Sequence, residues 1–209
     1  HALYRFLVDD MKNFIKWQTD ENLLVLNNNN DFVGAGSYGF TDELPTDACK
    51  ETGKVTLKDL WVNMNSQETV GISADMYGEF IYPYYRELAQ DAGLVYYGCC
   101  EPVHDIWDDY LSNLPNLRKV SIFSWCDQKF MGERLQNSKV IYSRKPSPNY
   151  IGVGTFDEQA FREHIKETLT AAKNCSLEII FRDIYTVNGD KEKAGRAVKI
   201  VRELIDTMQ

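Results

Sequence analysis

The sequence lacks long apolar runs and an excess of positive charge, and both absences exclude classes of protein. No stretch approaches the roughly 20 consecutive apolar residues that a membrane-spanning helix needs, and no charged-then-apolar leader opens the chain. The 23 Lys and Arg residues stand against 31 Asp and Glu, which gives a net charge of −8. Since this charge repels a phosphate backbone, we do not expect a nucleic acid as partner. Because long apolar runs are lacking, we expect a soluble protein without a membrane as partner.

Evenly spaced cysteines are also lacking. The five cysteines are an odd number, and only Cys99 and Cys100 are neighbours. Small secreted scaffolds use even, spaced sets, so a reducing, cytoplasmic location fits better. The 209 residues, 44% of them hydrophobic, suffice for one domain covering 1–209.

Helical and strand patterns alternate along the chain. Apolar residues at helical spacing follow Ser73, a residue type that favours helix starts, and this pattern ends at Gly93. The expected helices cover 2–18, 76–88, 106–111, 130–135, 161–172 and 194–205. The expected strands cover 23–26, 94–97, 120–123, 140–142 and 177–181, and a Gly-rich acidic loop is expected from Gly34 to Lys58.

Short apolar strands separated by helices indicate an α/β fold with a parallel sheet covered by helices. About five strands are present, short of the eight of a closed (β/α) barrel of the TIM type. Ligands of such sheets and barrels bind beyond the carboxyl ends of the strands.

Polar residues follow each expected strand. Because these loops meet at one edge of a parallel sheet, we expect their side chains to form one rim. The loops are Asn27–Asn30, Cys99–His104, Ser124–Asp127, Ser143–Lys145 and Arg182–Asp183.

The loop Cys99–His104 places two thiols, a carboxylate and an imidazole within six residues. Each is a ligand type that zinc accepts, so Cys99, Glu101 and His104 are candidate metal ligands. The alternative is structural: Cys99 buried at a strand end, Glu101 solvated and His104 at the start of the next helix.

Three basic residues, Arg144, Lys145 and Arg182, could hold a carboxylate or phosphate of a substrate. Ion pairs with acidic residues of the same rim are the alternative. Asn28 and Asn30 could orient a polar ligand, and Trp125 could form an apolar wall, although Asn-rich turns and core packing explain these residues as well. His164 is expected on the surface, in the middle of its helix.

Several motifs resemble the uroporphyrinogen-decarboxylase-like (URO-D) superfamily, and the resemblance covers most of the chain. They are 66–73 (SQETVGIS) followed by Met76 and 80–85 (FIYPYY), then 97–105 (YGCCEPVHD), 116–121 (NLRKVS) and 143–148 (SRKPSP). The last three resemble long motifs of an uncharacterised branch of that superfamily that is described as corrinoid-dependent methyltransferase-like.

The resemblance implies that the chain corresponds to the fourth to eighth strands of the barrel, so it is expected to be the C-terminal part of a full barrel. An open edge of a parallel sheet invites pairing, so homo-oligomerisation or completion by a partner chain through this edge is expected.

The resemblance also implies an activity, the transfer of a methyl group between a small methylated substrate and a corrinoid carried by a partner protein. Cys99 matches the middle ligand of the zinc site in the thiol-methylating branch, whereas Tyr97 stands in place of its His and Arg182-Asp183 in place of its last Cys. Asn27 or Asn28 stands where the tetrapyrrole decarboxylases carry a carboxylate. Cys99, Glu101 and His104 could bind zinc, or Glu101 and His104 could act as acid and base, with Asp183 as a further catalytic candidate.

Two other functions fit the same residues. A decarboxylase of a carboxylated ring compound would use the basic residues to hold carboxylates. A non-catalytic or fragmentary barrel module would account for the missing strands.

Overall fold

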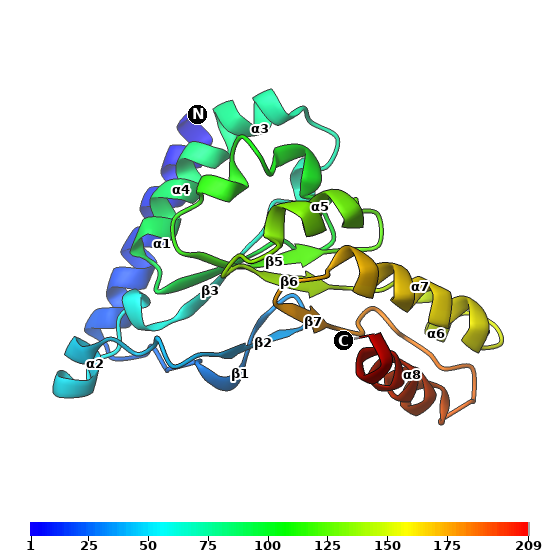
Figure 1. Cartoon of the computed structure of the whole chain (residues 1–209). Coiled ribbons are helices and arrows are strands. Elements are labelled where there is room, and N and C mark those ends of the chain that lie inside the picture. The colour runs from blue at the N-terminus through cyan, green and yellow to red at the C-terminus, as the bar shows by residue number, and fades with distance from the viewer. Residues whose placement is uncertain (209) are drawn as a thin grey trace. The chain divides into compact units, whose positions relative to one another are not determined.

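The computed structural model describes residues 1–208 and has an α/β architecture (Figure 1). Five strands form one parallel sheet in the order β3-β4-β5-β6-β7, with helices between them in the chain. The predicted α/β class with a helix-flanked parallel sheet is therefore confirmed. The strands are β3 (Trp61–Met64), β4 (Leu94–Tyr97), β5 (Leu117–Ile122), β6 (Ile141–Arg144) and β7 (Leu177–Ile179).

The chain divides into two compact units, His1–Ser121 and Ile122–Gln209. The prediction of a single domain over 1–209 stays a prediction. Among residues 1–208, no helix is both long and apolar enough to cross a membrane.

The first unit places helices against the strands β3 and β4, which pair in register from Trp61 with Leu94 to Met64 with Tyr97. Its helices are α1 (Ala2–Asp20), α2 (Asp47–Thr52), α3 (Ala74–Phe80) and α4 (Tyr82–Asp91), and α1 packs against α4 (Figure 1). Single 3-10 turns cover Leu57–Asp59, Gln67–Thr69, His104–Ile106 and Leu111–Asn113. A separate antiparallel hairpin consists of β1 (Asn29–Gly34) and β2 (Ser37–Phe40).

The predicted strand Leu23–Leu26 is wrong, although the number of parallel strands is five as expected. Residues 23–26 form neither a strand nor a helix, and Val25 is 78% exposed. The side chain of Asn27 binds both the N–H and the carbonyl of Trp61, at 2.9 Å each, so it occupies ladder positions that a strand backbone would use. The first strand of the sheet is instead β3, whose pattern of four residues is too short for a clear period.

The segment 76–88 forms two helices rather than the single predicted one. Ser73 caps α3 as expected, because its hydroxyl accepts a hydrogen bond from the Met76 N–H. Pro83 lacks the N–H that would continue a helix from α3, and it lies in the first turn of α4, where a helix tolerates proline; this accounts for the break at Ile81. The expected helix at 106–111 is also wrong, since only the two 3-10 turns occur there.

The second unit follows the prediction closely. Asp127 caps α5 (Gln128–Leu135) and Asp157 caps α7 (Glu158–Ala171), each by accepting the N–H three residues later. The helix α8 (Lys193–Met208) packs against α7, and α6 (Asn149–Gly152) is a single turn. The core between these helices contains Ile151, Phe156, Phe161, Ile165, Ala197, Ile200, Val201 and Leu204.

The close contact between α5 and α7 depends on Gly132. A Cβ atom at this position would lie 1.8 Å from the backbone oxygen of Ala171, which cannot move as a flexible side chain could. Gly195 in α8 has no atom within 4 Å of the corresponding point.

We therefore expect Gly132→Ala to lower the free energy of unfolding by roughly 1–3 kcal/mol, because overpacking forces the backbone apart. Gly195→Ala is the matched control and should raise it by about 0.5–1 kcal/mol. Urea denaturation of both variants measures the difference. Equal effects of the two substitutions would show that α5 and α7 do not pack in this way.

Candidate functional site

The loop after β4 turns sharply at Gly98, which has φ +97°. Its N–H donates to the carbonyl of Met64 over 2.7 Å, and a Cβ here would lie 3.0 Å from the Cβ of Ser121. The left-handed backbone and the close contact both favour glycine. This turn places Cys99, Cys100 and Glu101 at the carboxyl end of β4, as the sequence predicts.

Glu101 joins the loops that follow two neighbouring strands. Its side chain accepts the N–H of Ser66 at Oε1 (3.0 Å) and the N–H of Cys99 at Oε2 (2.8 Å), and the residue is only 3% exposed. Backbone N–H groups compensate the desolvation of a buried carboxylate. Glu101 is thus buried rather than solvated, and both of its oxygens organise the backbone of the site.

Three buried hydroxyl groups form a chain beside this carboxylate. The Ser66 hydroxyl lies 2.7 Å from that of Tyr97, which lies 2.9 Å from that of Tyr77. Burial raises the pKa of Tyr97 and of Tyr77 well above that of a solvated phenol. Both phenols therefore stay protonated near neutral pH and can act only as neutral hydrogen-bonding groups.

Cys99 and Cys100 present two thiols at the same edge. Their sulfur atoms lie 3.7 Å apart, and both residues are partly exposed. The Cys99 carbonyl accepts the Ser121 hydroxyl over 2.7 Å, which fixes the backbone between the two thiols and β5. A hollow of about 70 Å³ lies next to this loop and is lined in part by Ser66, Tyr77 and Glu101.

A zinc ion would find two suitably spaced sulfurs here, but no third ligand beside them. Two thiolates about 2.3 Å from a tetrahedral ion would lie roughly 3.8 Å apart. However, no group of three or more His, Cys, Asp or Glu side chains assembles in the part of the chain that the structure describes. Glu101 is held by backbone N–H groups, and Nε2 of His104 lies 3.7 Å from the Asp105 carboxylate. The residues Cys99, Glu101 and His104 thus do not form a zinc site as arranged.

The asparagine run lies elsewhere than the expected rim. Asn27 binds Trp61, the first residue of β3, and the Asn28 side chain donates to the Leu44 carbonyl over 2.7 Å. Asn30 is exposed in β1 with φ +65°. The side chains of Asn27 and Asn28 anchor the segment before the hairpin near the amino end of β3, whereas the thiols lie at the carboxyl end of β4. Ligand binding by Asn28 and Asn30 stays a prediction.

Arg144, in the second unit, is fully buried at the carboxyl end of β6. Its guanidinium donates to the carbonyls of Ile122 (3.1 Å) and Phe123 (2.9 Å) and to the Thr168 hydroxyl (3.2 Å). Within the described residues its hydrogen-bond partners are all uncharged, and burial lowers its pKa. Arg144 is therefore a buried cation rather than an open binding residue. Lys145 is fully buried as well.

His164 is half-buried in α7, so the predicted surface position is wrong. Its Nε2 lies 3.4 Å from Nη2 of Arg144 and 3.4 Å from the N–H of Ser147. Since both neighbours can only donate, Nε2 accepts and the ring proton resides on Nδ1. Burial, and secondarily the Arg144 charge, lowers the pKa of His164 to about 4.

Arg182 and Asp183 bind each other, with Nε of Arg182 3.2 Å from the carboxylate. This ion pair corresponds to the alternative that the sequence left open for the basic residues. Glu101 belongs to the first unit and Asp183 to the second.

Trp125 is 63% exposed and packs on Phe123 at a ring distance of 4.5 Å.

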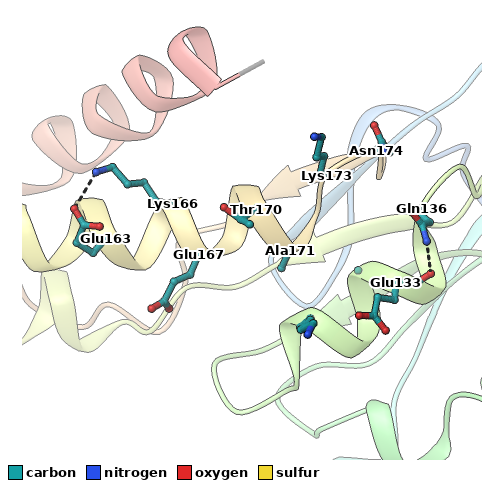
Figure 2. Close-up of a pocket in the computed structure, with 11 residues that line it drawn as sticks. Glu133, Gln136, Glu163, Lys166, Glu167, Thr170, Ala171, Lys173 and Asn174 are labelled. Carbon is teal, nitrogen blue, oxygen red and sulfur yellow. Dashed lines mark hydrogen bonds and ion pairs between the residues drawn. The ribbon is translucent and has the colours of Figure 1, made fainter.

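A hollow of about 630 Å³ in the second unit lies on the helices α5 and α7 rather than at the strand ends (Figure 2). Figure 2 shows Glu163, Lys166 and Glu167 on α7 along one side and Glu133 and Gln136 on α5 along the other. Glu163 and Lys166 form an ion pair of 2.9 Å. Charged residues of both signs line this hollow, which gives it no clear preference for a cation or an anion.

Comparison with known proteins leaves the family open. No protein-family model matches the chain, and a search of curated proteins found no match. The resemblance to the URO-D superfamily therefore stays a prediction.

We expect Glu101→Gln to lower the free energy of unfolding by roughly 1.5–3 kcal/mol. The glutamine NH2 group is a donor, so one of the two backbone N–H groups would face another donor and lose its hydrogen bond. Glu68→Gln, an exposed position in the preceding loop, is the matched control and should change it by less than about 0.5 kcal/mol. Chemical denaturation measures both. A neutral effect of Glu101→Gln would contradict the role of this carboxylate.

We expect His164 to remain neutral until the pH falls toward 4. Between about pH 6.5 and pH 4 the unfolded chain binds more protons at this residue than the folded chain does. The contribution of neutral His164 to the free energy of unfolding is thus fully present above about pH 6.5 and is lost as the pH falls toward 4. NMR titration of the imidazole measures its pKa, and a midpoint near 6.5 would contradict the buried position. The variant His164→Gln should lack this part of the pH dependence.

Proposed function

We propose that the protein is part of a (β/α) barrel that transfers a methyl group between a small methylated substrate and a corrinoid protein. The observation that carries the proposal is the pair of adjacent thiols at the carboxyl end of β4, supported by a buried carboxylate. Parallel α/β sheets bind their ligands at this end of the strands. The sequence resemblance to the corrinoid-dependent branch supports the same reaction, and the five parallel strands are compatible with part of such a barrel.

The residues of the chain would hold the substrate and supply a proton. The corrinoid of the partner protein supplies the metal that accepts the methyl group. As the methyl group departs from oxygen or nitrogen, the leaving atom needs a proton unless it is already cationic. The partly exposed thiols of Cys99 and Cys100 can donate it, whereas the buried phenols of Tyr97 and Tyr77 shape the floor of the site.

Glu101 acts as a positioning residue in this proposal. Because it binds the N–H of Cys99 directly, it fixes the backbone that carries the thiols. His104, 26% exposed in its side chain, follows in the same loop and could assist the proton transfer.

The test is methylcobalamin formation by the full protein, supplied with reduced cobalamin and a panel of methylated amines, ethers and thioethers. We expect activity with one donor class and a loss of at least tenfold in Cys99→Ser and Cys100→Ser. Cys175→Ser, a partly exposed cysteine of the second unit, is the matched control and should keep full activity.

Failure of every donor would overturn methyl transfer. Release of carbon dioxide from carboxylated ring compounds, without any methyl transfer, would support the decarboxylase instead.

A further inference from the structure

We propose that the second unit contains a binding site for a small carboxylate, formed by the loops after β5 and β6 together with α7. His164 would donate to the carboxylate, and Arg144 behind it would supply the attracting charge. The proposal does not rest on methyl transfer, since all of its residues belong to the second unit.

The site is a hollow of about 420 Å³, a size typical of pockets for small molecules. Its polar lining comes mainly from Ser124, Ser147, Asn149, Tyr150, Asp157 and His164. Ser124 follows β5, and Ser147 and Asn149 follow β6, so the hollow lies at the carboxyl ends of two parallel strands. This is where α/β folds bind ligands. Ser124 belongs to the polar rim expected from the sequence, whereas Ser147 and Asn149 lie beyond the loop Ser143–Lys145 of that rim.

One hydroxyl in this lining has no partner. The Oγ atom of Ser124 is buried and makes no hydrogen bond within the described residues. A buried polar atom left without a partner is rare and destabilising. A ligand oxygen in the hollow would accept the hydrogen bond that the Ser124 hydroxyl lacks.

His164 presents a second donor. Arg144 and the Ser147 N–H both occupy its Nε2, so the neutral ring carries its proton on Nδ1. The low pKa of the ring keeps it neutral at physiological pH. The imidazole can therefore donate one hydrogen bond from Nδ1 without being charged itself.

Arg144 makes an anion the favoured ligand. It is 0% exposed, and its described hydrogen-bond partners are two carbonyls, a hydroxyl and the imidazole. A buried cation acts over a longer range than a cation in water. Glu167 is the acidic residue that acts on Arg144 electrostatically, and His164 both contacts Arg144 and lines the hollow. A ligand with one negative charge would balance this cation.

The other wall residues favour a monocarboxylate over a phosphate. The carboxylate of Asp157 lies at the rim and would repel a dianion more strongly than a monoanion, and no Lys or Arg lines the hollow itself. The ring of Tyr150 lies 4.8 Å from that of His164, and Val153 and Ala160 add apolar contacts. These surfaces fit a small planar or apolar body attached to the carboxylate.

The test is NMR titration of the full chain with benzoate, and separately with benzamide and inorganic phosphate. Benzoate should bind saturably and raise the pKa of His164 above about 4, because an anion stabilises the imidazolium. Benzamide, which has the same shape without the charge, should bind at least tenfold more weakly. Phosphate should also bind more weakly than benzoate.

Two variants assign the donors. His164→Gln should weaken benzoate binding at least tenfold and Ser124→Ala severalfold, whereas Ser112→Ala, an exposed serine of the first unit, is the matched control and should have no effect. If His164→Gln fails to fold, two measurements still test the site: benzoate binding by Ser124→Ala, and the ratio of the benzoate and benzamide affinities of the unchanged protein. Equal binding of benzamide, tighter binding of phosphate, or no effect of benzoate on His164 would each overturn the carboxylate site.

Discussion

The burial of the Glu101 carboxylate is the constraint on which the candidate site of the first unit depends. A carboxylate that is 3% exposed requires compensating donors, and here both come from backbone N–H groups at Ser66 and Cys99. Ser66 follows β3 and Cys99 follows β4, so a single side chain fixes the distance between two loops. The hydroxyl chain from Ser66 to Tyr77 and the pair of thiols both extend from these two anchored points.

Much of the fold could be predicted because its elements bury apolar side chains at regular spacing. The strand Leu94–Tyr97 and the helices α7 and α8 agree with their predicted positions within a few residues. The prediction of a strand at 23–26 was wrong because of a contact that is distant in the sequence. The Asn27 side chain takes the hydrogen bonds of Trp61, 34 residues later. The break at Ile81 could have been predicted from Pro83, which removes an N–H donor.

The site could be located from the sequence, but the roles of its residues could not. The loop Cys99–His104 lies at the carboxyl end of β4 because strand order alone determines that position. Glu101 was a candidate ligand or acid, yet its partner Ser66 lies 35 residues earlier in the chain. His164 looked like a surface residue because its helix position is polar, whereas Arg144 and Ser147 reach its ring through space. Ser66 and Ser124 lie in segments that the sequence singles out, but nothing in the sequence assigns them a role, and Tyr77 carries no signal that separates it from ordinary aromatic residues.

Both units thus place a charged group out of water and balance it with uncharged donors or acceptors, Glu101 with N–H groups and Arg144 with carbonyls. The claim that the carboxylate of Glu101 organises the first of these sites is tested most directly by residue-specific hydrogen exchange of the unmodified protein. The account predicts that the Ser66 and Cys99 N–H groups exchange as slowly as those of the paired residues in β4. Exchange of either group at the rate of an unstructured peptide would contradict it.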